Sequence, residues 1–249
     1  MLTIFALRLA LGMIACLLLL PASIINPRFY RTHFLTALAL TGIALMWVRD
    51  SLGWPLLSVF CVAMVLAFVG SLVWGLEGTP GGRVFIVLTT LSLAGGLIGL
   101  EVSPDDHPPF LPLLLGDLTS SALLGSALTA MLLGHSYLIS PSMSLTPLIR
   151  MLAALALATV ARLGVDAYAL GAWTSVHSLV SLKGEDLVFL LPLRWLVGFL
   201  APLGLVWMAW QTARIRSTQS ATGILYVAVI FCFLGELTGQ LLRGTGMTF

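Results

Sequence analysis

Eight long apolar runs divide this chain, and they constrain its fold more than any other feature. They cover residues 3–25, 32–49, 54–75, 82–100, 119–139, 146–170, 187–212 and 221–242. Runs of this length match a helix that crosses the roughly 30 Å hydrocarbon core of a bilayer. None shows the alternation of short barrel strands. We therefore expect an all-α polytopic membrane protein with about eight transmembrane helices, forming a single integral membrane domain over residues 1–249.

The composition agrees with this class. Hydrophobic residues make up 59% of the chain and charged residues only 9%, whereas soluble domains carry about 25% charged residues. A net charge of +2 is too small to predict nucleic-acid binding. No nucleotide-binding, metalloprotease or haem-attachment motif occurs. We therefore expect no catalysis by this chain alone.

The loops between the runs predict an orientation from their basic residues. The first, third, fifth and seventh loops contain six arginines, namely Arg28, Arg31, Arg83, Arg150, Arg214 and Arg216. The other loops and the C-terminal tail contain three basic residues, namely Arg49, Lys183 and Arg243. This asymmetry predicts that both termini lie outside a bacterial-type inner (plasma) membrane. The longest loop, residues 101–118, then lies outside as well.

Four ionisable residues interrupt the later runs, where charge in hydrocarbon is costly and marks a functional or paired site. Arg162 and Asp166 belong to the sixth run, Arg194 to the seventh and Glu236 to the eighth. The predicted topology brings all four to one layer in the outer half of the membrane. Arg162 and Asp166 share a helix face by their i,i+4 spacing. Two polar residues complete the candidate site: Tyr168 at a similar depth, and Gln240 one turn beyond Glu236.

This candidate site has two interpretations. Two arginines and two carboxylates can neutralise each other and hold three helices in register. Alternatively, the same charges can surround a small molecule or a proton path, with a carboxylate accepting a proton from a quinol. Two G-x-x-x-G patterns, Gly95–Gly99 and Gly235–Gly239, predict close helix approach, the second around Glu236.

Histidine and cysteine give few metal candidates. His33 and His135 both fall near the predicted inner side, so a b-type haem between them is a minor alternative. The three cysteines lie inside apolar runs and fit no ligand spacing. We expect no bound metal and no covalently bound cofactor.

The C-terminal segments 219–226 and 233–240 form a distinctive pattern, which includes a Gly-Glu pair at Gly235 and Glu236. This pattern resembles the last span of the membrane anchors of dimethyl sulfoxide reductase, to which the eight-helix polysulfide reductase anchors are related. Gln240 stands where those anchors have arginine, and Arg243 follows closely. The resemblance implies an anchor for molybdenum and iron–sulfur subunits that exchanges electrons with quinone, and it favours Glu236 as a site residue.

The leading hypothesis is therefore an integral membrane subunit of an electron-transfer complex, binding quinone or lipid near the outer leaflet. Its partners would be other membrane or peripheral redox subunits, which would carry the redox centres. Two alternatives remain open: a purely structural membrane subunit of a larger complex, and a small transporter or exporter.

Overall fold

The computed structural model describes residues 1–76, 81–101, 110–140, 142–176 and 186–243. Within these ranges, eight helices are long and apolar enough to cross a membrane, and no residue is in a strand. The prediction of an all-α membrane protein is confirmed, and the chain is a multi-pass integral membrane protein. The side on which the termini lie, and the identity of the membrane, stay predictions.

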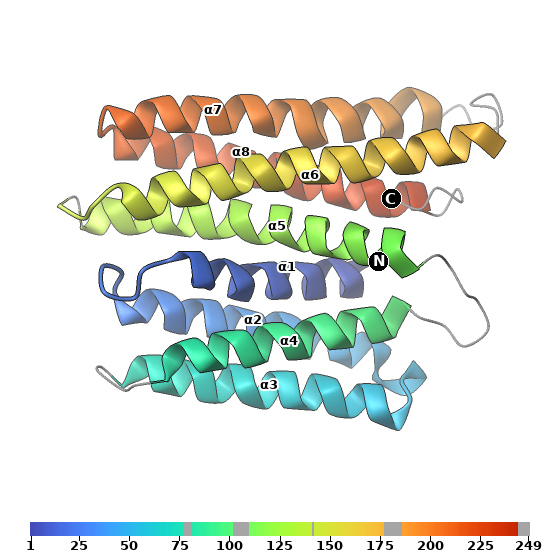
Figure 1. The fold of residues 1–249 in the computed structure, drawn as a ribbon, viewed down its shortest axis with the longest axis horizontal. Helices are drawn as coiled ribbons and strands as arrows, with labels where there is room; N and C mark the ends of the chain where they lie inside the picture. The colour runs from blue at the N-terminus through green and yellow to red at the C-terminus, as the bar shows by residue number, and fades with distance from the viewer. Residues whose placement is uncertain (77–80, 102–109, 141, 177–185, 244–249) are drawn as a thin grey trace. The chain divides into compact units, whose positions relative to one another are not determined.

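The helices fall into two compact units. The N-terminal unit is Leu2–Phe110 and the C-terminal unit is Leu111–Phe249 together with Met1 (Figure 1). The N-terminal unit contains α1 (Leu2–Cys16), α2 (Pro27–Val48), α3 (Trp54–Gly75) and α4 (Gly82–Glu101). The helices of the C-terminal unit are α5 (Phe110–Ile139), α6 (Thr146–Val176), α7 (Ala201–Arg214) and α8 (Thr218–Arg243). The first residue of α5, Phe110, is the last residue of the N-terminal unit. Two π-helical segments, Asp186–Leu190 and Leu193–Leu200, precede α7 in the seventh span.

The two largest differences between helix boundaries and apolar runs are at the end of α1 and the start of α5, and a proline lies at each. Smaller differences occur at the start of α2 and the end of α6, where each helix is longer than its apolar run. The first run extends to residue 25, but α1 ends at Cys16 and continues only as a 3-10 turn, Leu17–Leu19. Leu20 is extended because Pro21 disfavours a helical conformation in the residue before it. Conversely, α5 begins at Phe110, inside the predicted loop 101–118. Pro112 lies in its first turn, where proline is tolerated. Residues 102–109 of that loop lie outside the described residues.

The N-terminal unit is a four-helix bundle in which α1 contacts α2 and α4, and α3 contacts α2 and α4. Glycines bring α4 close to α3: a Cβ atom on Gly96 or Gly99 would lie 2.7 Å from the side chain of Phe60 or Leu56. Gly95 faces open space, so the helix contact uses Gly96 and Gly99 rather than the Gly95–Gly99 pair.

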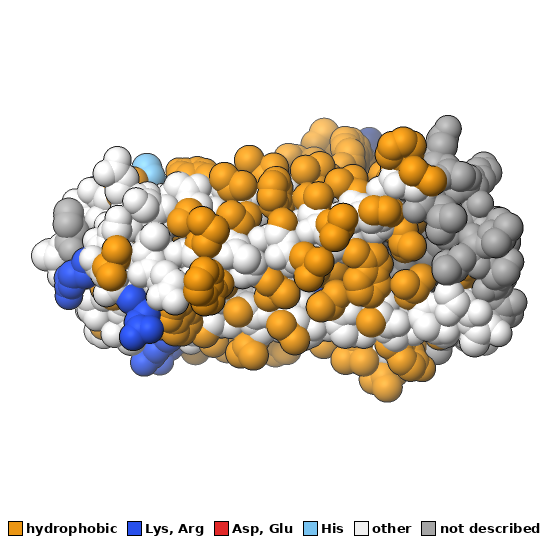
Figure 2. Space-filling view, turned by 90° about the horizontal axis from the view of Figure 1, so that it is seen from above, with side chains coloured by type: hydrophobic (Ala, Val, Ile, Leu, Met, Phe, Trp, Pro, Cys, Tyr) orange, Lys and Arg blue, Asp and Glu red, His pale blue; other side chains and the backbone are white. Residues whose placement is uncertain are grey.

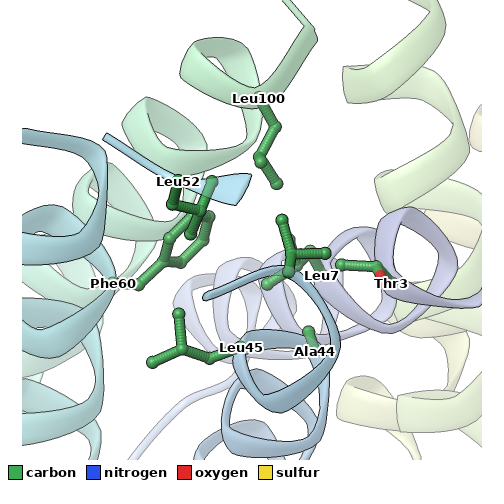
Figure 3. A pocket seen from close by; sticks show the side chains of 8 residues that line it. Thr3, Leu7, Ala44, Leu45, Leu52, Phe60 and Leu100 are labelled. Atoms are coloured by element: carbon green, nitrogen blue, oxygen red, sulfur yellow. The ribbon is translucent and has the colours of Figure 1, made fainter. Parts of the chain in front are cut away.

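An apolar pocket inside this unit is drawn in Figure 3, lined by side chains from α1, α2 and α4 and by Leu52 and Phe60. Its volume of about 10 Å³ is at the lower limit for one water molecule. The pocket is therefore a small packing gap and offers no room for a ligand.

The outward faces of the helices are apolar. Met46, Leu157 and Phe189 are among many large hydrophobic side chains that are mostly exposed. On the face in Figure 2, hydrophobic side chains spread along the length of the helices and a group of basic side chains lies at one end. Such surfaces suit contact with lipid chains, because lipid chains are as apolar as these side chains.

The start of α2 gives a first testable prediction. The side chain of Asn26 accepts a hydrogen bond from the backbone N–H of Arg28 at 2.9 Å, and Pro27 occupies the first helical position. Asn26→Ala is expected to lower the free energy of unfolding by about 0.5–2 kcal/mol. Asn26→Asp should keep the stability, because aspartate also caps helices. Detergent-induced unfolding followed by circular dichroism measures both, and an equal loss in the two variants would exclude capping.

Candidate functional site

The C-terminal unit brings together the four ionisable residues that the sequence analysis selected. We call Arg162, Asp166, Arg194 and Glu236 the four-charge network. Arg162 and Asp166 lie one turn apart on α6, Arg194 lies on the π-helical segment Leu193–Leu200, and Glu236 lies on α8. Each of the four side chains is at most 1% exposed. The network therefore joins three membrane spans through fully buried charges.

Glu236 is the centre of this network. Nε of Arg162 donates to its Oε1 at 3.0 Å, and Nη2 of Arg194 donates to the same oxygen at 2.9 Å. Its Oε2 accepts from the Ser120 hydroxyl of α5 at 2.5 Å and from Nη2 of Arg162 at 3.4 Å. Both oxygens of the Glu236 carboxylate are thus engaged by side chains from three other elements.

Asp166 completes the network from the side of α6. Its Oδ2 accepts from Nε of Arg194 at 2.6 Å, and its Oδ1 lies 3.1 Å from Nη1 of Arg162. The two arginines and two carboxylates carry opposite charges that sum to zero. Attraction between such groups is strong where the dielectric constant is low, and the pairing offsets the desolvation that burial imposes on each charge.

Glycine residues allow the helices to approach closely enough for these contacts. A Cβ atom on Gly198 would lie 2.9 Å from Cα of Gly235, and one on Gly235 would overlap the backbone of Gly198. A Cβ atom on Gly239 would lie 3.0 Å from Cζ of Arg194. The close approach predicted from Gly235–Gly239 is therefore present, and it places Arg194 directly against α8.

Arg194 also depends on its local backbone. Pro192 has no amide hydrogen, which interrupts the regular i→i−4 hydrogen bonding at the start of the π-helical segment. π-Helical segments are rare in proteins and are frequently found at functional sites. The guanidinium carbon of Arg194 lies 4.5 Å from the centre of the Phe199 ring, a cation–π contact.

Two further side chains belong near the network and were not predicted. Ser120 is buried on α5 and hydrogen-bonded to Glu236. Asp117 is also buried on α5, and its charge acts on Arg162. The sequence analysis assigned Asp117 to the long loop, so its burial follows from the earlier start of α5. The only sequence signal for Ser120 is its place in a polar patch of an otherwise apolar run.

The two uncharged candidates, Tyr168 and Gln240, differ in burial: the first is exposed and the second is buried. Tyr168 is 70% exposed, because it lies two residues beyond Asp166 and residues at that spacing point to different sides of a helix. The structure does not bring Tyr168 to the network. Gln240 is only 5% exposed, and its amide nitrogen and oxygen have no hydrogen-bond partner among the described residues.

The two histidines lie in different units. His33 is buried on α2, where its Nδ1 donates to the carbonyl oxygen of Phe29 at 2.9 Å, and His135 is exposed on α5. Among the described residues, no group of three or more histidine, cysteine, aspartate or glutamate side chains could hold a metal ion.

Comparison with known proteins adds no identification. No protein-family model, curated protein or solved structure matches this chain. The function is therefore argued from the site alone.

Proposed function

We propose that this protein is an integral membrane subunit of an electron-transfer complex, and that it holds a quinone or lipid beside the four-charge network. The observation that carries the proposal is Gln240, a buried amide without a hydrogen-bond partner among the described residues. It lies one helical turn from Glu236 on α8. Leaving such a group unpaired costs about 1–3 kcal/mol. A bound molecule with oxygen atoms would remove that cost.

The amide suits both redox states of a quinone. Its N–H groups can donate to the carbonyl oxygens of the oxidised ring, and its oxygen can accept from the hydroxyls of the reduced ring. A lipid ester would use the donor alone. The redox centres are assigned to partner subunits, and the resemblance of the last span to quinone-linked anchors supports this assignment.

Glu236 has a positioning role in this proposal. Its carboxylate already accepts hydrogen bonds from Ser120, Arg162 and Arg194. A general base needs hydrogen-bond reach to the proton that it removes, and these contacts occupy both oxygens. We therefore assign Glu236 to holding α8, and with it Gln240, in place.

A purely structural subunit is the second candidate, favoured by the balance of the four charges. In that case the network serves only to fix the register of three spans. The two candidates differ at Gln240, because a structural subunit needs no exchangeable molecule there.

Gln240→Leu separates the two candidates. The leucine removes both hydrogen-bonding groups at similar volume, so quinol-linked electron transfer by the purified complex is expected to fall about tenfold, mainly through weaker quinol binding. Gln211→Leu, at an exposed position on α7, is the matched control and should leave the rate unchanged. Equal rates in both variants, with normal assembly, would support the structural candidate.

The partner subunits need their own test. Gentle extraction from the native membrane, followed by mass spectrometry and an optical spectrum, should yield stoichiometric subunits with iron–sulfur, molybdenum or cytochrome centres. A lone, colourless protein would contradict the electron-transfer proposal. Solute flux into liposomes containing only this chain would instead support a transporter.

A further inference from the structure

A second polar region lies in the N-terminal unit, at the end of the bundle where α3 ends and where α2 and α4 begin (left in Figure 1). A cavity of about 390 Å³ opens there, within the size range of small-molecule sites. Its described walls include Pro27, Val73, Trp74, Leu76, Gly82 and Arg83. This cavity is unrelated to the four-charge network, which belongs to the other unit.

Two hydrogen-bond donors belong to the walls of this cavity. Arg83 is exposed and offers the planar guanidinium that binds phosphate oxygens in pairs. The indole N–H of Trp74 is shielded from solvent and has no hydrogen-bond partner among the described residues. Indole nitrogen can only donate, so the unmet requirement at Trp74 is for an acceptor.

Trp74 is held rigidly in this position. Its ring stacks on Tyr30 with centroids 4.0 Å apart and an interplanar angle of 10°. Gly82 also packs against Trp74, since a Cβ atom on Gly82 would lie 2.7 Å from the indole ring. Tyr30 is fixed in turn, because its hydroxyl donates to the carbonyl oxygen of Leu20 at 3.1 Å. The donor is therefore preorganised.

The electrostatic surroundings favour an anion. Two helices, α2 and α4, begin at Pro27 and Gly82 in the cavity wall, and helix N-termini carry partial positive charge. Arg28 and Arg31 lie in the first turns of α2 and add further positive charge at this end. No aspartate or glutamate is among the described wall residues.

We propose that this cavity binds the phosphate group of an anionic phospholipid, such as phosphatidylglycerol, from the leaflet at this end of the helices. Arg83 and the Trp74 N–H bind the phosphate oxygens, and Val73 and Leu76 contact the upper part of the apolar acyl chains. A lipid is favoured over free phosphate because the cavity lies at the ends of membrane-crossing helices and combines donors with apolar walls. The inference does not rest on the quinone proposal.

Native mass spectrometry of the full-length protein, loaded with phosphatidylglycerol in detergent, tests this site. Arg83→Gln is expected to weaken lipid retention about tenfold or more, because it removes a charge-assisted contact. Trp74→Phe keeps the ring stack but removes the donor, and should weaken retention roughly two- to tenfold. Arg150→Gln is the matched control, since it removes the same charge from an exposed position on α6.

Three outcomes would overturn the proposal. Equal losses in Arg83→Gln and Arg150→Gln would mean that retention reflects general surface charge. If both Trp74→Phe and Arg83→Gln retained the lipid as well as the unchanged protein does, the cavity would not be the lipid site. Displacement of the lipid by millimolar inorganic phosphate, with phosphate retained on the lipid-free protein, would identify free phosphate as the ligand.

Discussion

Glu236→Gln is expected to lower the free energy of unfolding by about 3–5 kcal/mol, the cost of breaking a buried ion pair by removing one partner. Glutamine keeps the shape of the side chain but removes its negative charge. Asp166 would then be the one carboxylate of the four-charge network left to Arg162 and Arg194, and the network would keep a net positive charge in the membrane. Unfolding by graded denaturing detergent, followed by circular dichroism, measures the loss.

A double variant shows whether the lost charge balance is the cause of the lower stability. Arg162→Gln combined with Glu236→Gln removes one charge of each sign and leaves the Arg194–Asp166 pair, in which nitrogen and oxygen are 2.6 Å apart. The double variant should therefore be more stable than the sum of the single losses predicts, by about 0.5–3 kcal/mol. Strict additivity of the two losses would contradict a coupled network.

Gly235→Ala is the second substitution with a large expected effect. The added methyl group would overlap the backbone of Gly198, and backbone cannot move aside as a flexible side chain can. We expect a loss of about 1–3 kcal/mol or more from overpacking. The forced separation of α8 from the segment Leu193–Leu200 would also lengthen the contacts between Arg194 and Glu236. The same unfolding measurement applies.

Gly223→Ala provides the control on the same helix. A Cβ atom at Gly223 meets no heavy atom within 4 Å, and alanine is favoured over glycine in helices by up to about 1 kcal/mol. Gly223→Ala should therefore be neutral or stabilising. If Gly235→Ala behaved in the same way, the close approach of the two backbones would not be a determinant of stability.

The membrane fold and the membership of the four-charge network could be predicted from sequence because both depend on simple rules. Apolar length predicts the spans, and charge in hydrocarbon is rare enough to select Arg162, Asp166, Arg194 and Glu236. Helix rotation is different, because it is determined by packing between side chains that are distant in sequence. For that reason Tyr168 was included although it faces outward, and Ser120 was missed although it contacts Glu236.

Local backbone features also could not be predicted from the apolar runs. The π-helical segment around Arg194 depends on interrupted hydrogen bonding near Pro192, which leaves no mark on hydropathy. The start of α5 at Phe110 moved Asp117 from a predicted loop into a buried helical position.

The distribution of charge among the spans has a consequence for biogenesis. Span six contains both Arg162 and Asp166, so it carries its own counter-ion as it leaves the translocon. The seventh span carries Arg194 and the eighth carries Glu236, and each alone would bring a single charge into hydrocarbon. Only three residues, 215–217, separate α7 from α8. The last two spans are therefore suited to enter the bilayer together as one helical hairpin, with the charge of each masked by the other during insertion.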